Sequence, residues 1–306
     1  MTDDALPTGA RELLVLWAAR ECEVLDALAT SAGTPEDVAT ETGITPVAAD
    51  TLVTALADRG LVEQVGDEYE PTNRLLGFLT KTDLRSIGRL PHALDTFDAW
   101  LALPETARTG TPPDPSEYAT RNELGTEWSR DDTTVRATVT AAVRAHPDAD
   151  SVVVLRDGPG RHAREFLARG FEVTLVETPE RADAAAPLLR PTEVRLETGG
   201  YVDSIPQTDL VCAVDLTRRH TPEENRAWLR AAQAALEPGG AVVAVEPLRD
   251  HTPDAALLDV ETLATGGARI SEEATVREWF ENAGFALDLE PVPGTDRVAL
   301  VGRRVQ

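Results

Sequence analysis

The stretch VVVLRDGPGRH, residues 152–162, decides the fold of this chain. Its apolar run from Val152 to Leu155 predicts a buried strand, and the residues after it predict a glycine turn followed by a helix. A buried strand that enters a glycine-rich turn and a helix is typical of nucleotide-type cofactor sites. This turn has unusual contents, because an arginine and a proline lie in it and His162 stands where a third glycine is expected.

Strands and helices alternate on the C-terminal side of this stretch. Apolar runs that predict strands occupy residues 171–177, 192–200, 209–215, 241–247, 285–292 and 296–305. Residues with helical spacing occupy 162–170, 178–189, 222–240 and 271–285. This alternation predicts an α/β fold with a parallel, doubly wound sheet, in which ligands bind beyond the carboxyl ends of the strands.

Several candidate ligand-binding residues follow these strands. Gly158 and Gly160 allow close approach of the backbone to a ligand, and the following helix presents free N–H groups. Glu177 lies 177 − 158 = 19 residues after Gly158, close to the spacing of about 20 at which an acid binds a ribose diol. The expected cofactor-binding residues are Asp157, Gly158, Gly160, Glu177, Asp203 and Asp215.

The N-terminal 110 residues read as helical. Helices are predicted over 11–30, 34–42 and 45–60, the last two with Thr34 and Thr45 as N-caps, and a hairpin is predicted around Gly66. Helix, turn, helix and hairpin indicate a winged helix. Residues 34–74 contain nine acidic and two basic residues, a net charge of −7 that opposes binding to phosphates. We therefore expect a structural or dimer-forming role.

Glycine and proline residues between 110 and 115 indicate a linker. The predicted organisation is an all-α winged-helix dimerisation domain over residues 1–115, a linker and connecting helix over 116–150, and a Rossmann-like domain over 151–306.

The composition excludes several classes of function. The 306 residues carry a net charge of −24, and Lys81 is the sole lysine, a bias that resembles proteins of salt-loving archaea. We expect no nucleic-acid partner, because basic clusters are absent, and no membrane span, because no apolar run reaches about 18 residues. Cys22 and Cys212 are expected to be free thiols, and no metal-ligand cluster is apparent. A cytoplasmic location follows from these features.

Three segments resemble one enzyme family. LALPETARTGTPP (101–113), TPEENRAWLRAAQAALEPGGAVVAVEPL (221–248) and LLDVETLATGGARISEEATVREWFENAGF (257–285) are similar to segments of S-adenosylmethionine-dependent O-methyltransferases with an N-terminal winged-helix dimerisation domain, the plant caffeate and bacterial polyketide type. The resemblance implies a class I methyltransferase fold, a homodimer formed through the N-terminal domain, S-adenosylmethionine as cofactor, and methyl transfer to a hydroxyl of a small-molecule acceptor.

The sequence departs from this family where the chemistry is expected. The family's LDVGGGTG loop reads LRDGPGRH, and Gly200 stands where an Asp meets the cofactor, although Asp203 lies nearby. Arg218 replaces the catalytic His, and His220 lies two residues further along. The resemblance leaves His220 and Glu246 as the candidate catalytic residues; His220 is either the base or a surface histidine.

The roles of Arg218 and Arg269 are open, as are three hypotheses for the function. An alternative role for Arg218, and for Arg269, which replaces an acid of the family, is to pair with a carboxylate or phosphate of a ligand. The first hypothesis is an active methyltransferase. The second is a non-catalytic, dimeric ligand-binding or regulatory protein that has lost the cofactor, and the third, DNA-binding regulation, is disfavoured by the acidic winged helix.

Overall fold

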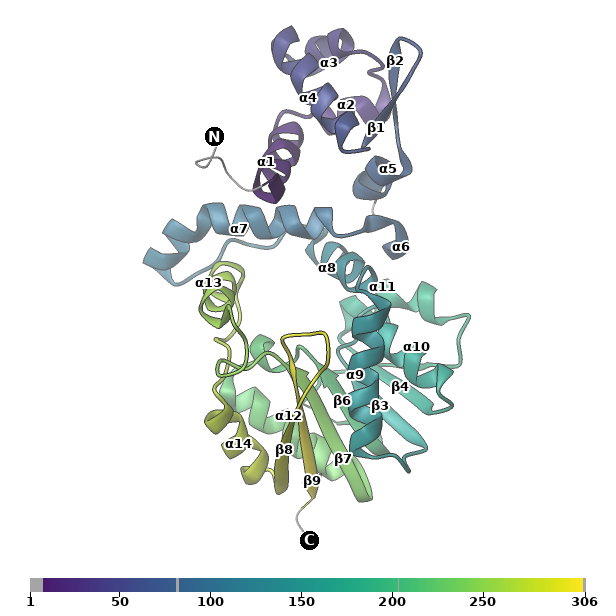
Figure 1. Cartoon of the computed structure of the whole chain (residues 1–306), viewed down its shortest axis with the longest axis vertical. Coiled ribbons are helices and arrows are strands. Elements are labelled where there is room, and N and C mark those ends of the chain that lie inside the picture. The colour runs from purple at the N-terminus through teal and green to yellow at the C-terminus, as the bar shows by residue number, and fades with distance from the viewer. Residues whose placement is uncertain (1–7, 81–82, 203, 305–306) are drawn as a thin grey trace. The chain divides into compact units, whose positions relative to one another are not determined.

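The computed structural model describes residues 8–80, 83–202 and 204–304 (Figure 1). The chain forms two compact units, one made of residues up to 98 together with 115–126, the other of 99–114 together with 127–306. The division at residues 115 and 150 expected from the sequence stays a prediction.

The first unit is mainly helical. It contains α1 (Thr8–Glu21), α2 (Val24–Thr30), α3 (Pro35–Thr42), α4 (Pro46–Asp58), the strands β1 (Val62–Val65) and β2 (Glu68–Pro71), α5 (Asn73–Thr80) and α6 (Leu84–Ile87). It also includes the first part of α7 (Leu90–Thr109) and most of α8 (Ala119–Trp128). The helix–turn–helix followed by an antiparallel hairpin that the sequence predicts is present, since α3, α4 and the β1–β2 pair occur in that order.

The caps of α3 and α4 are those predicted. The Thr34 hydroxyl accepts a hydrogen bond from the Asp37 N–H, and the Asp37 carboxylate accepts one from the Thr34 N–H, so two free backbone donors are satisfied at once. Thr45 caps α4 in the same manner through the Ala48 N–H. Apolar side chains of α1 to α5 pack into one core that includes Val38, Val53 and Leu56.

The second unit is built on a seven-stranded sheet of order β5-β4-β3-β6-β7-β9-β8 (Figure 1). Its strands are β3 (Ser151–Leu155), β4 (Glu172–Glu177), β5 (Arg195–Thr198), β6 (Thr208–Val214), β7 (Leu236–Glu246), β8 (Phe285–Pro291) and β9 (Val298–Arg304). The first five in this order are parallel, and β9 and β8 are antiparallel to their neighbours. The predicted α/β sheet is therefore confirmed, with β5 shorter than the stretch 192–200.

Helices cover both faces of the sheet. They are α9 (Asp132–Ala145), α10 (Arg161–Ala168) and α11 (Pro179–Leu189) on one face, and α12 (Pro222–Ala235) and α14 (Glu273–Asn282) on the other. The same unit also contains α13 (Ala255–Thr265) and a 3₁₀ turn, η1, at Thr217–Arg219. Val152 and Val154 of β3 join a core with α9, α10 and α11, whereas Val153 and Leu155 join one with α12 and α14. Alternate residues point to opposite faces, so a strand covered on both faces must be apolar throughout.

None of the helices that the structure describes is both long and apolar enough to cross a membrane.

Candidate functional site

Two non-glycine residues adopt left-handed backbone conformations at the carboxyl ends of neighbouring strands. Arg156 follows β3 with φ 56°, and Asp215 follows β6 with φ 51°. This conformation is costly for side chains other than glycine and is found preferentially at functional sites. Both residues are buried, at 6% and 3% exposure. The carboxyl edge of the central strands is therefore the candidate site.

The glycine loop between β3 and α10 is held by the side chain of Asp157. Its Oδ2 accepts a hydrogen bond from the Ala163 N–H at 2.7 Å, and its Oδ1 lies 2.5 Å from His162 Nδ1. Gly158 and Gly160 have positive φ values of 60° and 81°. Asp157, a predicted cofactor-binding residue, thus contacts the first turn of the helix that follows it.

Glu177 lies directly beneath this loop, as its spacing from Gly158 suggested. Its Oε1 accepts a hydrogen bond from the Gly158 N–H at 2.5 Å. Its Oε2 accepts from Arg181 Nε at 3.2 Å and from the Tyr201 hydroxyl at 2.6 Å. Complete burial raises the pKa of Glu177, and Arg181, Tyr201 and the Gly158 N–H partly counter this. The structure therefore brings two predicted cofactor-binding residues, Gly158 and Glu177, into contact.

Glu127 and Arg181 complete an ion-pair network that sequence reasoning missed. Glu127, at the end of α8, accepts from Arg156 Nη1 at 3.2 Å and from Arg181 Nη2 at 2.6 Å. Arg181 therefore links Glu127 to Glu177. Nothing in the local sequence around Glu127 marks it as a site residue.

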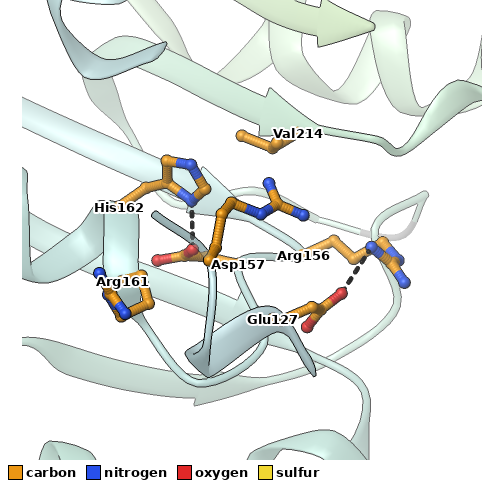
Figure 2. Close-up of a pocket in the computed structure, with 7 residues that line it drawn as sticks. Glu127, Arg156, Asp157, Arg161, His162 and Val214 are labelled. Carbon is orange, nitrogen blue, oxygen red and sulfur yellow. Dashed lines mark hydrogen bonds and ion pairs between the residues drawn. The ribbon is translucent and has the colours of Figure 1, made fainter. Parts of the chain in front are cut away.

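Figure 2 shows side chains that line the space beside the loop, with Arg156 paired to Glu127 and His162 next to Asp157. The remaining hollow has a volume of about 10 Å³, roughly the room that one water molecule needs. It is lined by Glu127, Arg130, Arg156, Asp157, Arg161, His162 and Val214. His162 Nε2 is buried there without a hydrogen-bond partner among the described residues, which suits a bound water.

Asp215 is a structural ion-pair centre in this arrangement. Arg297, from the segment between β8 and β9, contacts both of its carboxylate oxygens, at 2.9 and 3.0 Å. Arg130 adds a contact at 3.3 Å. These cations lower the pKa of Asp215 well below its usual range in spite of its burial. Its carboxylate is thus committed to two arginines.

Glu246 is the last residue of β7 and is fully buried at the carboxyl edge of the sheet. Its Oε1 accepts hydrogen bonds from the Leu216 and Thr217 N–H groups at 2.7 and 3.1 Å. Its Oε2 is buried and has no hydrogen-bond partner within the described part of the chain. Burial, together with the nearby charge of Asp215, raises the pKa of Glu246 to about 7. A carboxyl group in this state can exchange a proton near neutral pH.

His220 lies on the other side of Leu216. Its Nδ1 is 3.0 Å from the Leu216 carbonyl oxygen, and its ring stands edge-on to Tyr201 with centroids 5.8 Å apart. Both predicted catalytic residues therefore contact the backbone of Leu216, Glu246 at its N–H and His220 at its carbonyl oxygen.

The remaining candidates have different positions. Arg218 borders this cluster, since it follows Thr217 and its charge helps to lower the pKa of Asp215, and it lies 4.0 Å from Glu261. Arg269 is 80% exposed and pairs with Asp259. Asp203, a predicted cofactor-binding residue, lies outside the described residues. Within those residues no group of His, Cys, Asp and Glu side chains is arranged to hold a metal ion.

The match to known protein families covers part of this site, which includes Glu177, Asp215 and Glu246 but not Asp157 or Gly158. Residues 160–286 match the family model described as the O-methyltransferase domain. The second unit contains an O-methyltransferase domain. A comparison with curated proteins found no match.

Solved structures share the fold of the O-methyltransferase domain and of the unit that precedes it. Mitomycin 7-O-methyltransferase MmcR aligns with a TM-score of 0.71 at 21% identity, over 97% of this chain and 95% of its own. Human N-acetylserotonin methyltransferase, solved in complex with S-adenosylmethionine, gives 0.68 at 19% identity over all of both chains. PigF, solved with S-adenosylhomocysteine, gives 0.68 at 19% identity over 97% of each chain.

These comparisons confirm the methyltransferase fold expected from the sequence. Because the identities are low, we take only the fold from the solved structures. The class of enzyme expected from the sequence, an O-methyltransferase, is confirmed by the domain match, and S-adenosylmethionine as cofactor is in agreement with the ligands of the neighbours.

Proposed function

We propose that this protein transfers a methyl group from S-adenosylmethionine to a hydroxyl of a small-molecule acceptor. One observation carries the proposal: Glu177, at the carboxyl end of β4, lies against the Gly158 N–H of the loop that follows β3. This places a carboxylate beside a glycine loop in the arrangement that binds the ribose of a nucleoside cofactor. The match of residues 160–286 to the O-methyltransferase domain supports the reaction class.

The hydrogen bonds that Glu177 accepts are of the kind that a ribose diol would donate. Its Oε2 already accepts a neutral hydroxyl, that of Tyr201, at 2.6 Å, so a sugar hydroxyl makes the same kind of hydrogen bond there. The cofactor supplies an activated methyl group when it is bound. Gly158, Gly160 and Glu177 are the residues that would hold its nucleoside part.

We assign Glu246 as the proton acceptor for the acceptor hydroxyl. Its free Oε2 and its pKa of about 7 allow it to take a proton near neutral pH. His220 is the second candidate, because a neutral imidazole that donates through Nδ1 to Leu216 keeps Nε2 as an acceptor. Arg218, which occupies the position of the family's base, cannot accept a proton.

Calorimetric titration with S-adenosylhomocysteine in multimolar KCl tests the cofactor assignment. We expect the wild-type protein to bind and the Glu177→Ala variant to lose binding. Glu172→Ala is the matched control, because Glu172 is an exposed carboxylate on the same strand. If a folded wild-type protein binds neither S-adenosylmethionine nor S-adenosylhomocysteine at millimolar concentration, the non-catalytic alternative replaces this proposal.

The proposal extends to the first unit, which we infer to be a winged-helix dimerisation module in a cytoplasmic protein. The hairpin that follows α4 supports the winged helix, and Val47 at the start of α4 is 77% exposed. The free thiols Cys22 and Cys212 suit a reducing compartment. Sedimentation equilibrium tests the oligomeric state, and a monomer at micromolar concentration would contradict the inference.

A further inference from the structure

Tyr201 occupies the position on Glu177 that the proposed function gives to the cofactor. Its hydroxyl donates to Glu177 Oε2 at 2.6 Å, and both residues are buried, at 5% and 0% exposure. A phenol and a ribose hydroxyl are both neutral O–H donors, so they compete for the same oxygen. We propose that Tyr201 is an internal competitor of the cofactor and that its displacement sets the affinity of the site for the nucleoside. This inference rests on the proposed function.

A sugar hydroxyl replaces the other hydrogen-bond partners of Glu177 less easily than it replaces the Tyr201 hydroxyl. The Gly158 N–H belongs to the backbone of the glycine loop, where Gly158 has a positive φ of 60°. Arg181 is charged and bridges Glu177 to Glu127, so its loss would leave a buried carboxylate without a counter-ion. Tyr201 carries no charge, and exchange of its hydroxyl for a sugar hydroxyl leaves every ion pair intact.

The local backbone allows Tyr201 to move without disturbing a strand. It lies in a turn beyond the end of β5, and the preceding residues are Gly199 and Gly200. A Cβ added to Gly199 would meet no atom within 4 Å, so the backbone there has space around it. The ring of Tyr201 stands edge-on to His220 and belongs to the apolar core on one face of the sheet, so the group that exchanges is the hydroxyl and not the ring.

Titration of S-adenosylhomocysteine into three proteins tests the inference. The wild type, Tyr201→Phe and the control Tyr69→Phe are compared by calorimetry. Tyr201→Phe keeps the aromatic ring and removes the competing hydroxyl, so we expect its Kd to fall about tenfold, equivalent to about 1.4 kcal/mol. Its thermal midpoint without ligand should fall, because Glu177 loses a donor. A structural role alone would not tighten ligand binding while it lowers stability.

The outcomes separate this inference from the proposed function. If Tyr201→Phe binds within twofold of the wild type, or more weakly, and Glu177→Ala abolishes binding, Tyr201 is no competitor and the proposed function stands. If the wild type and Tyr201→Phe are both folded and neither binds S-adenosylhomocysteine at millimolar concentration, both proposals are overturned.

A second measurement uses the wild-type protein, in case Tyr201→Phe does not fold. The chain has three tyrosines, so 3-fluorotyrosine labelling gives three ¹⁹F resonances, and Tyr69→Phe and Tyr118→Phe assign that of Tyr201 by elimination. We expect S-adenosylhomocysteine to shift the Tyr201 resonance as the hydroxyl leaves Glu177. Binding in the calorimeter with an unmoved Tyr201 resonance would contradict the inference.

Discussion

Asp215 and Glu246 show how position alone gives two carboxyl groups opposite properties. Both are buried at the carboxyl edge of neighbouring strands. Asp215 faces Arg297 and Arg130, which lower its pKa, whereas Glu246 is hydrogen-bonded through one oxygen and has its pKa raised to about 7. Environments that separate the pKa values of neighbouring acids are typical of sites with acid–base chemistry.

Glu246→Gln should change how stability depends on pH. The folded pKa of Glu246 lies above the usual value of 4.5, so the wild-type free energy of unfolding falls as pH rises from about 4.5 to about 7. A difference of about 2.5 pKa units corresponds to about 3 kcal/mol at most. Glutamine does not ionise, so the stability of the variant relative to wild type should increase by about 1 to 3 kcal/mol between pH 5 and pH 8.

Urea unfolding at both pH values measures this change. Glu172→Gln, at an exposed position of β4, is the control and should show no such increase. The same Glu246→Gln difference at pH 5 and pH 8 would mean that Glu246 is ionised in the folded protein at both values.

Asp215→Asn should destabilise the second unit. The substitution leaves Arg297 and Arg130 without the carboxylate that they share, and loss of one partner from a buried ion pair costs about 3 to 5 kcal/mol. Because the folded pKa of Asp215 is lowered, its stabilisation is present above the usual value of 3.8 and is lost as pH falls below it.

Denaturant unfolding at pH 7 tests this effect against Asp296→Asn. Asp296 also contacts Arg297 but has a side chain that is 53% exposed, so its removal should cost less than about 1 kcal/mol. Equal losses for the two variants would contradict the assignment of Asp215 as the ion-pair centre.

At the scale of structural elements, the connection from β3 to α10 has a strict steric requirement. Gly160 combines a φ of +81° with close packing, since an added Cβ would lie 2.5 Å from Leu189 Cδ2 of α11. The loop is thus fixed between the helix that it starts and a neighbouring helix. Gly158 and Gly160 both match glycines of the family pattern that the loop resembles, and for Gly160 this packing supplies a physical reason.

Gly160→Ala should cost more stability than Gly170→Ala. Both glycines have positive φ, at 81° and 93°, so each substitution has a backbone cost of about 1 kcal/mol. A Cβ at Gly170 would meet no atom within 4 Å, whereas one at Gly160 would clash with Leu189. We expect an additional loss of about 1 to 3 kcal/mol for Gly160→Ala. Equal midpoints in thermal unfolding would show that α11 adjusts without cost.

For the whole molecule, the dominant physical property is its net charge of −24. Like charges of this number repel one another and oppose the compact state, and salt screens that repulsion. We expect the thermal midpoint to rise by several degrees between 0.1 M and 2 M KCl. Sorbitol at matched osmolarity is the control, because it does not screen charge. An equal rise in sorbitol would assign the effect to exclusion of the cosolute rather than to charge.

Local patterns in the sequence were sufficient for the elements and for part of the site. The alternation of apolar runs and helical segments predicted the α/β sheet, and Thr34 and Thr45 predicted two helix starts, because these signals act between residues close in the chain. The 19-residue spacing from Gly158 to Glu177 led us to expect both residues in one cofactor site, and in the structure they are in contact, because β4 pairs with β3 in parallel.

Tertiary structure alone decided what surrounds Glu177 and Asp215. Tyr201 reaches Glu177 across 24 residues, Arg181 reaches Glu127 across 54, and Arg297 reaches Asp215 across 82. These contacts depend on the strand order β5-β4-β3-β6-β7-β9-β8, which places the carboxyl ends of distant segments side by side. No local pattern encodes that order, because it results from burial of both faces of the sheet. The sequence by itself therefore located the glycine loop and Glu177, and only packing brought Tyr201 to Glu177 and Arg297 to Asp215.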